Sequence, residues 1–224
     1  MANPYFRNLP DFEYVNRTTD GRNISDYTTV KNFFKKGKLR EDIFQNVTFF
    51  DKYYIKGNDR PDNVANEIYG DPTLDWIVLS SNNILNIQSE WPIDQLSFND
   101  FLLDKYGNTT EVFGGIHHYE SLEVKDNDGV MVFPKGLRVD EDQTVTFFDR
   151  GSSSYIEVTD MTLGITNYQH EEKLNNAKRE IFVLKPRYLN IVVDDLEEMM
   201  EYKKGSTQYV NGTLKRAQNS RLFQ

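Results

Sequence analysis

The fold is decided by the stretch YYIKGNDRPDNVANEIYGDPTLDWIVLSSNNI, which runs from Tyr53 to Ile84. It opens with a short β-prone run, Tyr-Tyr-Ile, and Gly57 then begins a cluster of turn-forming residues. Pro61 suits the first position of a helix, where its missing N–H costs nothing. Gly70 suits the left-handed cap that ends a helix. The first half of the stretch therefore predicts a strand, a turn and a helix.

The second half of the stretch repeats these signals. Asp71 and Pro72 form another helix start. Asn82 and Asn83 then end that helix. Apolar residues recur at helical spacing in both segments, namely Val64, Ala65, Ile68 and Tyr69, then Leu74, Ile77 and Val78. We therefore expect two short helices, each with one buried face.

An aromatic strand, a glycine-containing turn and two short helices resemble the LysM module. The matching positions are Tyr54, Gly57, the segment Asp62–Gly70 and Asn82. The departure lies in the turn, which reads Gly-Asn-Asp-Arg-Pro where LysM modules have Gly-Asp-Thr or Gly-Asp-Ser. Those turn residues help to form the glycan groove of the module. The resemblance therefore implies the fold of the module, and glycan binding stays an alternative.

The composition excludes several classes of function. The chain has 224 residues, and its 13 Tyr, 15 Phe and 2 Trp argue against wholesale disorder. A net charge of −9 disfavours non-specific nucleic-acid binding, which needs a basic surface. The absence of cysteine excludes disulfides, thiolate catalysis and cysteine-ligated metals. No apolar run reaches about 18 residues, so we expect no membrane span, and the first residues lack the apolar core of a signal peptide.

Residues 1–45 carry no lasting helical or strand period. Many of their side chains are aromatic, namely Tyr5, Phe6, Phe12, Tyr14, Tyr27, Phe33, Phe34 and Phe44. Leaving so many rings in water is costly, at ~25 cal/mol per Å² of apolar surface. We therefore expect an extended arm that docks on its own domain or on a partner. The basic run from Lys31 to Arg40 is expected to be a solvated loop, with contact to an acidic partner face as the alternative.

Further helices are expected on both sides of a β region. One covers about Asp94–Tyr106, with Phe98, Phe101 and Leu102 on one face. A second begins at the cap Thr166 and runs to about Arg179, with Tyr168, Leu174 and Ala177 as its inner face. The last is expected to bury Ile191, Val192, Leu196, Met199 and Met200. Strand-like runs lie between the first two helices, at 112–113, 116–119, 122–124, 130–133, 137–139, 144–148 and 155–158.

These patterns predict an α+β fold. It consists of a LysM-like strand–helix–helix module, a small antiparallel β region, an extended N-terminal arm and C-terminal helices. The predicted segments are the arm at 1–45, the LysM-like helical module at 46–107, the β region at 108–165, the helical C-terminal region at 166–203 and a basic, mobile tail at 204–224.

No pattern of residues indicates an active site. The sequence has no P-loop, no dinucleotide fingerprint and no Gly-x-Ser-x-Gly. His117 and His118 are adjacent, so on a strand they are expected to point to opposite faces and not to chelate one metal ion. His170 stands alone in the sequence. Trp76 and Trp91 could stack on sugars, but their apolar contexts favour core or interface roles. We therefore expect no catalytic, cofactor or metal residues, and not an enzyme.

Several blocks follow one another along the chain in a recognisable order. They are Tyr5-Phe6 with Pro10, Arg60-Pro61-Asp62, Tyr69-Gly70, Asp75-Trp76, Trp91-Pro92, Tyr106-Gly107, His117-His118-Tyr119-Glu120 and the run Asn176–Leu184. In this order they resemble the small baseplate wedge subunit of contractile-tailed, T-even-type bacteriophages, a family that carries a LysM-like module. Residues 125–160 and those after 203 match least clearly.

The resemblance implies a structural protein of the virion tail baseplate, made in the host cytoplasm and present in six copies per baseplate. It implies that the subunit ties neighbouring wedges together during tail assembly. The implied partners are the core-bundle wedge subunits, the lysozyme-like subunit that initiates the sheath, and the central hub. No nucleic-acid or membrane partner is expected. The predicted interface residues are Tyr5, Phe6, Phe12, Tyr14, Tyr27, Phe33, Phe34, Trp76 and Trp91.

Two other hypotheses stay open at this point. A peptidoglycan-binding LysM-type module rests on the opening stretch and predicts binding to cell-wall sacculi. A cell-wall hydrolase rests on the 35 Asp and Glu residues, although no spacing singles out one carboxylate pair.

Overall fold

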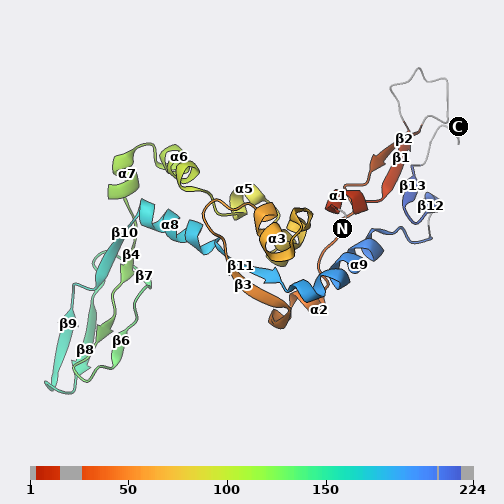
Figure 1. Cartoon of the computed structure of the whole chain (residues 1–224). Coiled ribbons are helices and arrows are strands. Elements are labelled where there is room, and N and C mark those ends of the chain that lie inside the picture. Colours follow the sequence, from red (N-terminus) through yellow and green to blue (C-terminus); the bar gives the residue numbers. More distant parts are fainter. Residues whose placement is uncertain (1–3, 16–26, 206, 218–224) are drawn as a thin grey trace. The chain divides into compact units, whose positions relative to one another are not determined.

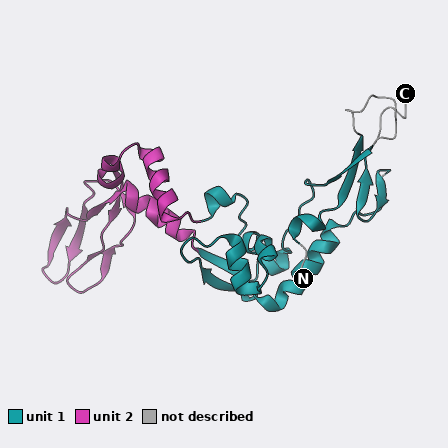
Figure 2. Ribbon diagram, turned by 45° about the horizontal axis from the view of Figure 1, so that its top comes forward, with its two compact units in different colours: residues 1–91, 180–224 teal, residues 92–179 magenta. Residues whose placement is uncertain are grey.

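The computed structural model describes residues 4–15, 27–205 and 207–217. The chain forms two compact units (Figure 2), with residues 1–91 and 180–224 in unit 1 and residues 92–179 in unit 2. Both units contain helices and small sheets, which confirms the predicted α+β class. Residues 1–3 and 16–26 of the predicted arm, and 206 and 218–224 of the predicted tail, lie outside the described residues. The five-segment division of the sequence stays a prediction.

Unit 1 combines elements from both ends of the chain (Figure 1). In chain order they are α1 (Tyr5–Asn8), β1 (Asp11–Val15), β2 (Tyr27–Lys31), α2 (Glu41–Phe44), the 3₁₀ turn η1 (Val47–Phe49), β3 (Phe50–Tyr54), α3 (Pro61–Tyr69), η2 (Pro72–Leu74), α4 (Asp75–Ser81), α5 (Ile87–Glu90), β11 (Glu180–Leu184), η3 (Pro186–Tyr188), α9 (Leu189–Met200), β12 (Tyr209–Asn211) and β13 (Leu214–Arg216).

The two helices predicted from the opening stretch are confirmed. Pro61 occupies the first position of α3, and Gly70 ends this helix with a φ of +72°. The Asp71 side chain accepts a hydrogen bond from the Thr73 backbone N–H, which starts η2 and then α4. Val64 and Ile77 are both 0 % exposed, so each helix has the buried face that its apolar spacing predicts.

A second strand completes this part of unit 1. β11 pairs with β3 in antiparallel register, from Leu184 opposite Phe50 to Glu180 opposite Tyr54. Asn82, at the end of α4, exchanges two hydrogen bonds with the Phe182 backbone, each 2.8 Å long. The helix pair and the two strands therefore form one packed body. The likeness of this body to a LysM module stays a proposal.

The two ends of the chain meet in a four-stranded sheet of order β12-β13-β1-β2. β1 runs antiparallel to β2 and parallel to β13. The predicted tail is therefore a hairpin where the structure describes it. The buried side chains of Leu9, Leu39 and Ile43 belong to the core of unit 1, so the arm docks on its own domain.

Unit 2 is a helical layer joined to short strands. Its elements are α6 (Gln95–Tyr106), α7 (Thr109–Gly114), β4 (Ile116–Ser121), β5 (Val124–Lys125), β6 (Met131–Phe133), β7 (Arg138–Val139), β8 (Val145–Asp149), β9 (Ser154–Val158), β10 (Thr162–Thr166) and α8 (Asn167–Ala177). The strands form a sheet of order β10-β4-β7 and the two hairpins β5–β6 and β8–β9. The buried apolar cluster of the unit is Phe98, Leu102 and Val112.

One predicted strand is wrong, because Val112 and Phe113 lie in helix α7. The Asn108 side chain accepts a hydrogen bond from the Glu111 backbone N–H, 2.8 Å away, and so caps this helix. Val112 is 2 % exposed and belongs to the buried cluster with Phe98 and Leu102 of α6, against which Tyr168 of α8 packs. A short helix with a single buried residue has no period to detect, and its cap was the only signal.

Three predicted inner faces also need correction. Leu174 in α8 is 47 % exposed, and Ala177 is exposed as well, whereas the polar Asn167 and Glu171 of the same helix are buried. Phe101 in α6 is 39 % exposed, and Ile191 in α9 is 46 % exposed. Apolar spacing marks the centre of a helix face well, but residues at the edge of the face, and polar residues with partners inside, escape it.

Candidate interaction surface

Three exposed phenylalanines of unit 1 lie in α1 and directly after β2. Phe6 in α1 is 63 % exposed, and Phe33 and Phe34, which follow β2, are 65 % and 99 % exposed. The Phe6 and Phe33 ring centroids are 6.1 Å apart in an edge-to-face arrangement. We call these three residues the ring cluster. The three rings are exposed to solvent, although the buried core of unit 1 lies nearby.

The ring cluster is anchored to that core through Tyr5. The Tyr5 ring lies 5.5 Å from the Phe6 ring and 5.8 Å from the buried Trp76 ring, measured between centroids. The Tyr5 hydroxyl accepts a hydrogen bond of 3.0 Å from the Gly37 backbone N–H. Tyr5 therefore connects the two segments that carry the ring cluster. It precedes Phe6 in α1, and it binds the backbone at Gly37, three residues after Phe34.

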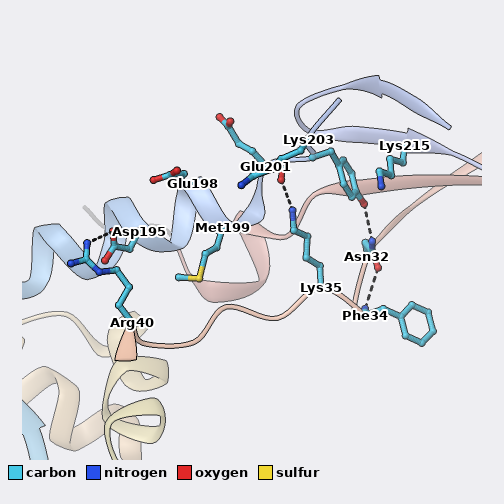
Figure 3. Close-up of a pocket in the computed structure, with 11 residues that line it drawn as sticks. Asn32, Phe34, Lys35, Arg40, Asp195, Glu198, Met199, Glu201, Lys203 and Lys215 are labelled. Atoms are coloured by element: carbon cyan, nitrogen blue, oxygen red, sulfur yellow. Dashed lines mark hydrogen bonds and ion pairs between the residues drawn. The ribbon is translucent and has the colours of Figure 1, made fainter. Parts of the chain in front are cut away.

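A groove of about 690 Å³ lies beside Phe34 and is lined by the segment after β2, the end of α9 and β13 (Figure 3). Asn32 shapes its wall, because its Nδ2 donates to the Tyr202 hydroxyl (2.8 Å) and its Oδ1 accepts from the Phe34 backbone N–H (3.1 Å). Lys35 Nζ donates to the Glu201 carbonyl oxygen, 2.5 Å away. These contacts tie the segment to the end of α9 and leave the Phe34 ring free.

The groove is rimmed by both signs of charge. Lys35 Nζ and Lys215 Nζ each lie 4.9 Å from the centroid of the Tyr202 ring, an arrangement suited to cation–π attraction. Burial, together with the neighbouring Lys215, lowers the pKa of Lys35. Arg40 pairs with Asp42 at 2.5 Å and with Asp195 at 3.4 Å. The basic run of residues 31–40 is therefore partly engaged with α9 and not wholly solvated.

The other predicted interface residues fall into two groups. Phe12 and Tyr27 are half-buried and Tyr14 is 41 % exposed, all on the β1–β2 pair. Trp76 and Trp91 are 9 % and 6 % exposed and belong to the core of unit 1, so they fill its interior. The tryptophans therefore present little surface to a partner.

The histidines lie in unit 2 in an arrangement that the sequence did not predict. On β10, Ile165 pairs with His118 and Thr166 pairs with Ile116, so His117 is an extra residue in a β-bulge. The bulge turns its side chain toward that of His118, and their Nδ1 atoms are 2.9 Å apart. The prediction that the two side chains point to opposite faces is therefore wrong.

His170, on α8, completes this cluster. Its ring stacks on that of His117, with centroids 3.7 Å apart and planes inclined by 10°. Burial and the neighbouring His170 and His118 lower the pKa of His117. Among the residues that the structure describes, these three histidines form the one group of His, Asp and Glu side chains close enough to share a metal ion.

Exposed aromatic rings within a rim of mixed charge have the composition of a protein–protein interface. Such a surface fits a structural subunit of a larger assembly. A family model described as base plate wedge protein 53 matches residues 5–196, and the chain belongs to this family. The chain is 26 % identical over 177 residues to baseplate wedge protein gp53 of Enterobacteria phage T4, across 74 % of this chain and 86 % of that protein.

Family membership confirms the resemblance seen in the sequence. The protein is a structural component of the baseplate of a phage tail and associates there with other baseplate subunits. Among the described residues, no helix is both long and apolar enough to cross a membrane.

Proposed function

We propose that this protein ties neighbouring wedge subunits together during tail assembly, with the ring cluster of Phe6, Phe33 and Phe34 as its main contact. The observation that carries the proposal is that these rings are 63–99 % exposed in the folded chain. Burying aromatic area is the largest favourable contribution that a surface can make to association. A partner that covers the ring cluster would gain this contribution.

The charged residues around the groove supply the specificity of the same contact. Lys203 and Lys215 line it together with Glu198 and Glu201 at the end of α9. Charges at the rim of an interface select the partner and its register more than they add affinity. We therefore expect the partner to present an apolar pocket edged by charges of both signs.

The proposed partners are the core-bundle wedge subunits, the lysozyme-like subunit that initiates the sheath, and the central hub, with six copies of this chain per baseplate. A purely structural role, without catalysis, is part of the proposal. On the β1–β2 pair, Phe12 and Tyr14 lie on one face and Tyr27, opposite Val15, lies on the other, and we propose these rings as secondary contacts.

The test is assembly of purified wedge subunits of the same phage with the double variant Phe33→Ser/Phe34→Ser. Both side chains are exposed, so the variant is expected to fold as the natural chain does. We expect it to be lost from wedge complexes on a sucrose gradient. Deleting residues 1–45 would be a poorer test, because Leu9, Leu39 and Ile43 belong to the core of unit 1.

The matched control is Leu96→Ser, which removes an apolar side chain 77 % exposed in unit 2. This variant is expected to enter wedges normally. Normal assembly of the double phenylalanine variant would refute the role of the ring cluster.

A second candidate is a peptidoglycan-binding module of the LysM type. It is supported by the arrangement of β3, α3, α4 and β11, in which two short helices accompany a two-stranded sheet. Binding to purified sacculi that chitin oligomers compete away would favour it. Wedge assembly by a chain that ignores sacculi would favour the structural role alone.

A further inference from the structure

We propose that His117, His118 and His170 in unit 2 together bind one divalent transition-metal ion that, like zinc, takes imidazole nitrogens as ligands. The three ring nitrogens that face the centre of this histidine cluster all lie within 4.8 Å of one another. A zinc–imidazole bond is about 2.0–2.1 Å long, so two nitrogens on a tetrahedral ion are about 3.4 Å apart. The widest pair of the cluster therefore has to close by at most about 1.4 Å, and the 2.9 Å pair of His117 and His118 has to open by about 0.5 Å.

The backbone holds the three side chains together without a metal. The β-bulge at His117 brings it to the same side of β4 as His118. β10 leads directly into α8 (Figure 1), and a capping box between Thr166 and Gln169 fixes the start of this helix. Because strand and helix position the ligands in advance, metal binding has little conformational entropy to overcome.

The surroundings of His118 match those of a metal ligand. Its Nε2 lies 3.4 Å from Glu120 Oε1, and Glu120 is held in turn by Lys173 Nζ at 2.9 Å. Histidines that bind metals through one ring nitrogen usually donate the other N–H to a carboxylate or carbonyl. In this arrangement His118 turns its Nδ1 toward the ion, and Glu120 fixes the orientation of the ring.

The protons on the ring nitrogens of His117 and His118 can also be accounted for when a metal ion binds. With an N–H at Nε2 facing Glu120, His118 accepts the 2.9 Å hydrogen bond at its Nδ1, and the Nδ1 of His117 carries the shared proton. Metal binding needs lone pairs on both Nδ1 atoms. The proton therefore moves through solvent to Nε2 of His117, which stays a neutral imidazole. Three neutral ligands leave a fourth position of a tetrahedral ion to water.

Three imidazoles select the class of ion. Nitrogen ligands suit zinc, cobalt, nickel and copper, whereas magnesium and calcium take oxygen ligands. The chain contains three histidines and no cysteine. Any imidazole-dependent metal binding by the untagged chain must therefore come from this cluster, which makes the proposal easy to isolate.

The experiment is a calorimetric titration of the untagged, chelator-treated full chain with zinc chloride. We expect one equivalent to bind, with no competition from excess magnesium. The triple variant His117→Gln/His118→Gln/His170→Gln is expected to lose this binding. Glu120→Gln keeps all three ligands and should weaken binding by about 10- to 100-fold. Asp126→Asn, a change in a surface turn of the same unit, is the matched control and should bind as the natural chain does.

Circular dichroism of the metal-free variants shows whether each one folds. If the triple variant does not fold, zinc X-ray absorption of the natural chain provides the second measurement, with three imidazole nitrogens expected at about 2.0–2.1 Å. Equal zinc affinity of the natural chain and the folded triple variant would overturn the proposal. So would a zinc spectrum with oxygen ligands only, or failure of the natural chain to bind zinc.

Discussion

The apolar core of unit 1 spreads over α3, α4, α9 and the β3–β11 pair, whereas unit 2 has the small cluster of Phe98, Leu102 and Val112 and, apart from it, the buried side chains of Val124 and Met161. Unit 2 instead buries polar groups that have specific partners. Asn167 Nδ2 donates to the Glu111 carbonyl oxygen at 2.9 Å, and Glu171 accepts from Lys105 at 2.7 Å and from Tyr106 at 2.9 Å. The difference shows that one chain can stabilise its units in two ways. Unit 1 relies on the burial of apolar side chains, and unit 2 relies more on buried polar groups that have hydrogen-bond partners.

The stability of each unit can be measured separately. Both tryptophans of the chain, Trp76 and Trp91, lie in unit 1. Tryptophan fluorescence during urea unfolding therefore reports unit 1, and hydrogen exchange of peptides from residues 92–179 reports unit 2. A substitution in one unit should change the signal of that unit and leave the signal of the other unit unchanged.

The largest effect is expected from Ile77→Ala in unit 1. Ile77 is 0 % exposed, so the change leaves a cavity and should cost about 2–5 kcal/mol of unfolding free energy. The fluorescence midpoint in urea should fall accordingly. The control Leu85→Ala removes a side chain 82 % exposed and should change the free energy by less than about 0.5 kcal/mol. A loss below about 1 kcal/mol for Ile77→Ala would mean that the core of unit 1 is loosely packed.

The next effect is expected from Gly115→Ala in unit 2. An added Cβ would lie 2.5 Å from the Glu111 backbone oxygen and 2.6 Å from Asn167 Nδ2. The clash falls on a polar contact of the interior, so the variant should lose about 1–3 kcal/mol. Hydrogen exchange in α7 and α8 should become faster while the fluorescence transition stays unchanged.

Its neighbour in the chain is a matched control. A Cβ added at Gly114 meets nothing within 4 Å, and this residue is helical. Gly114→Ala should therefore be neutral or gain up to about 1 kcal/mol from helix propensity. Equal exchange rates in the two variants would show that the tight contact at Gly115 does not constrain unit 2.

The same comparison explains how far sequence alone could go. In unit 1 both α3 and α4 have apolar faces, and α3 also has a proline at its start and a glycine at its end, so Pro61 and Gly70 marked the boundaries of α3 correctly. These signals are local. The four-stranded sheet depends instead on β1 meeting β13, whose residues lie some 200 positions later along the chain, and no local period records such pairing.

In unit 2 the sequence patterns predicted burial and side-chain direction less well, for a physical reason. Buried polar residues such as Glu171 look like surface residues in a sequence. The β-bulge at His117 shifts the alternation on which the opposite-face argument rested. Of the predicted interface residues, the exposure of Phe34 and the burial of Trp76 could not be separated either, because both are aromatic residues that suit a core and an interface equally.

A third prediction concerns the ion pair in unit 2 between the buried Glu171 and the half-exposed Lys105. Lys105→Met removes a partner of Glu171, which is 5 % exposed, and should cost about 1–3 kcal/mol near neutral pH. Burial alone would raise the pKa of Glu171, but the hydrogen bonds from Lys105 and Tyr106 lower it below its usual 4.5. The ionised carboxylate therefore stabilises the fold above that pH, and this contribution is lost as the pH falls through the lowered value.

Hydrogen exchange of unit 2 between pH 7 and pH 3 would measure this dependence, after correction for the intrinsic exchange rate. The natural chain should lose more stability in acid than Lys105→Met does. Lys125→Met is the control, because its pair with Glu123 is about half exposed on both sides and should contribute at most about 1 kcal/mol. Identical acid profiles for the natural chain and Lys105→Met would contradict the role assigned to the pair.

The smallest effect is expected from Gly70→Ala in unit 1, where the cost lies in the backbone alone. Gly70 has a φ of +72°, its N–H donates to the Asn66 carbonyl oxygen, and an added Cβ would meet no atom within 4 Å. Alanine in this left-handed conformation should cost about 1 kcal/mol, seen as a small shift of the fluorescence midpoint. Gly70→Asn should cost less, because asparagine tolerates the same conformation. If both variants cost the same, the backbone conformation is not the cause, and the end of α3 must be fixed by its packing, as the rest of unit 1 is.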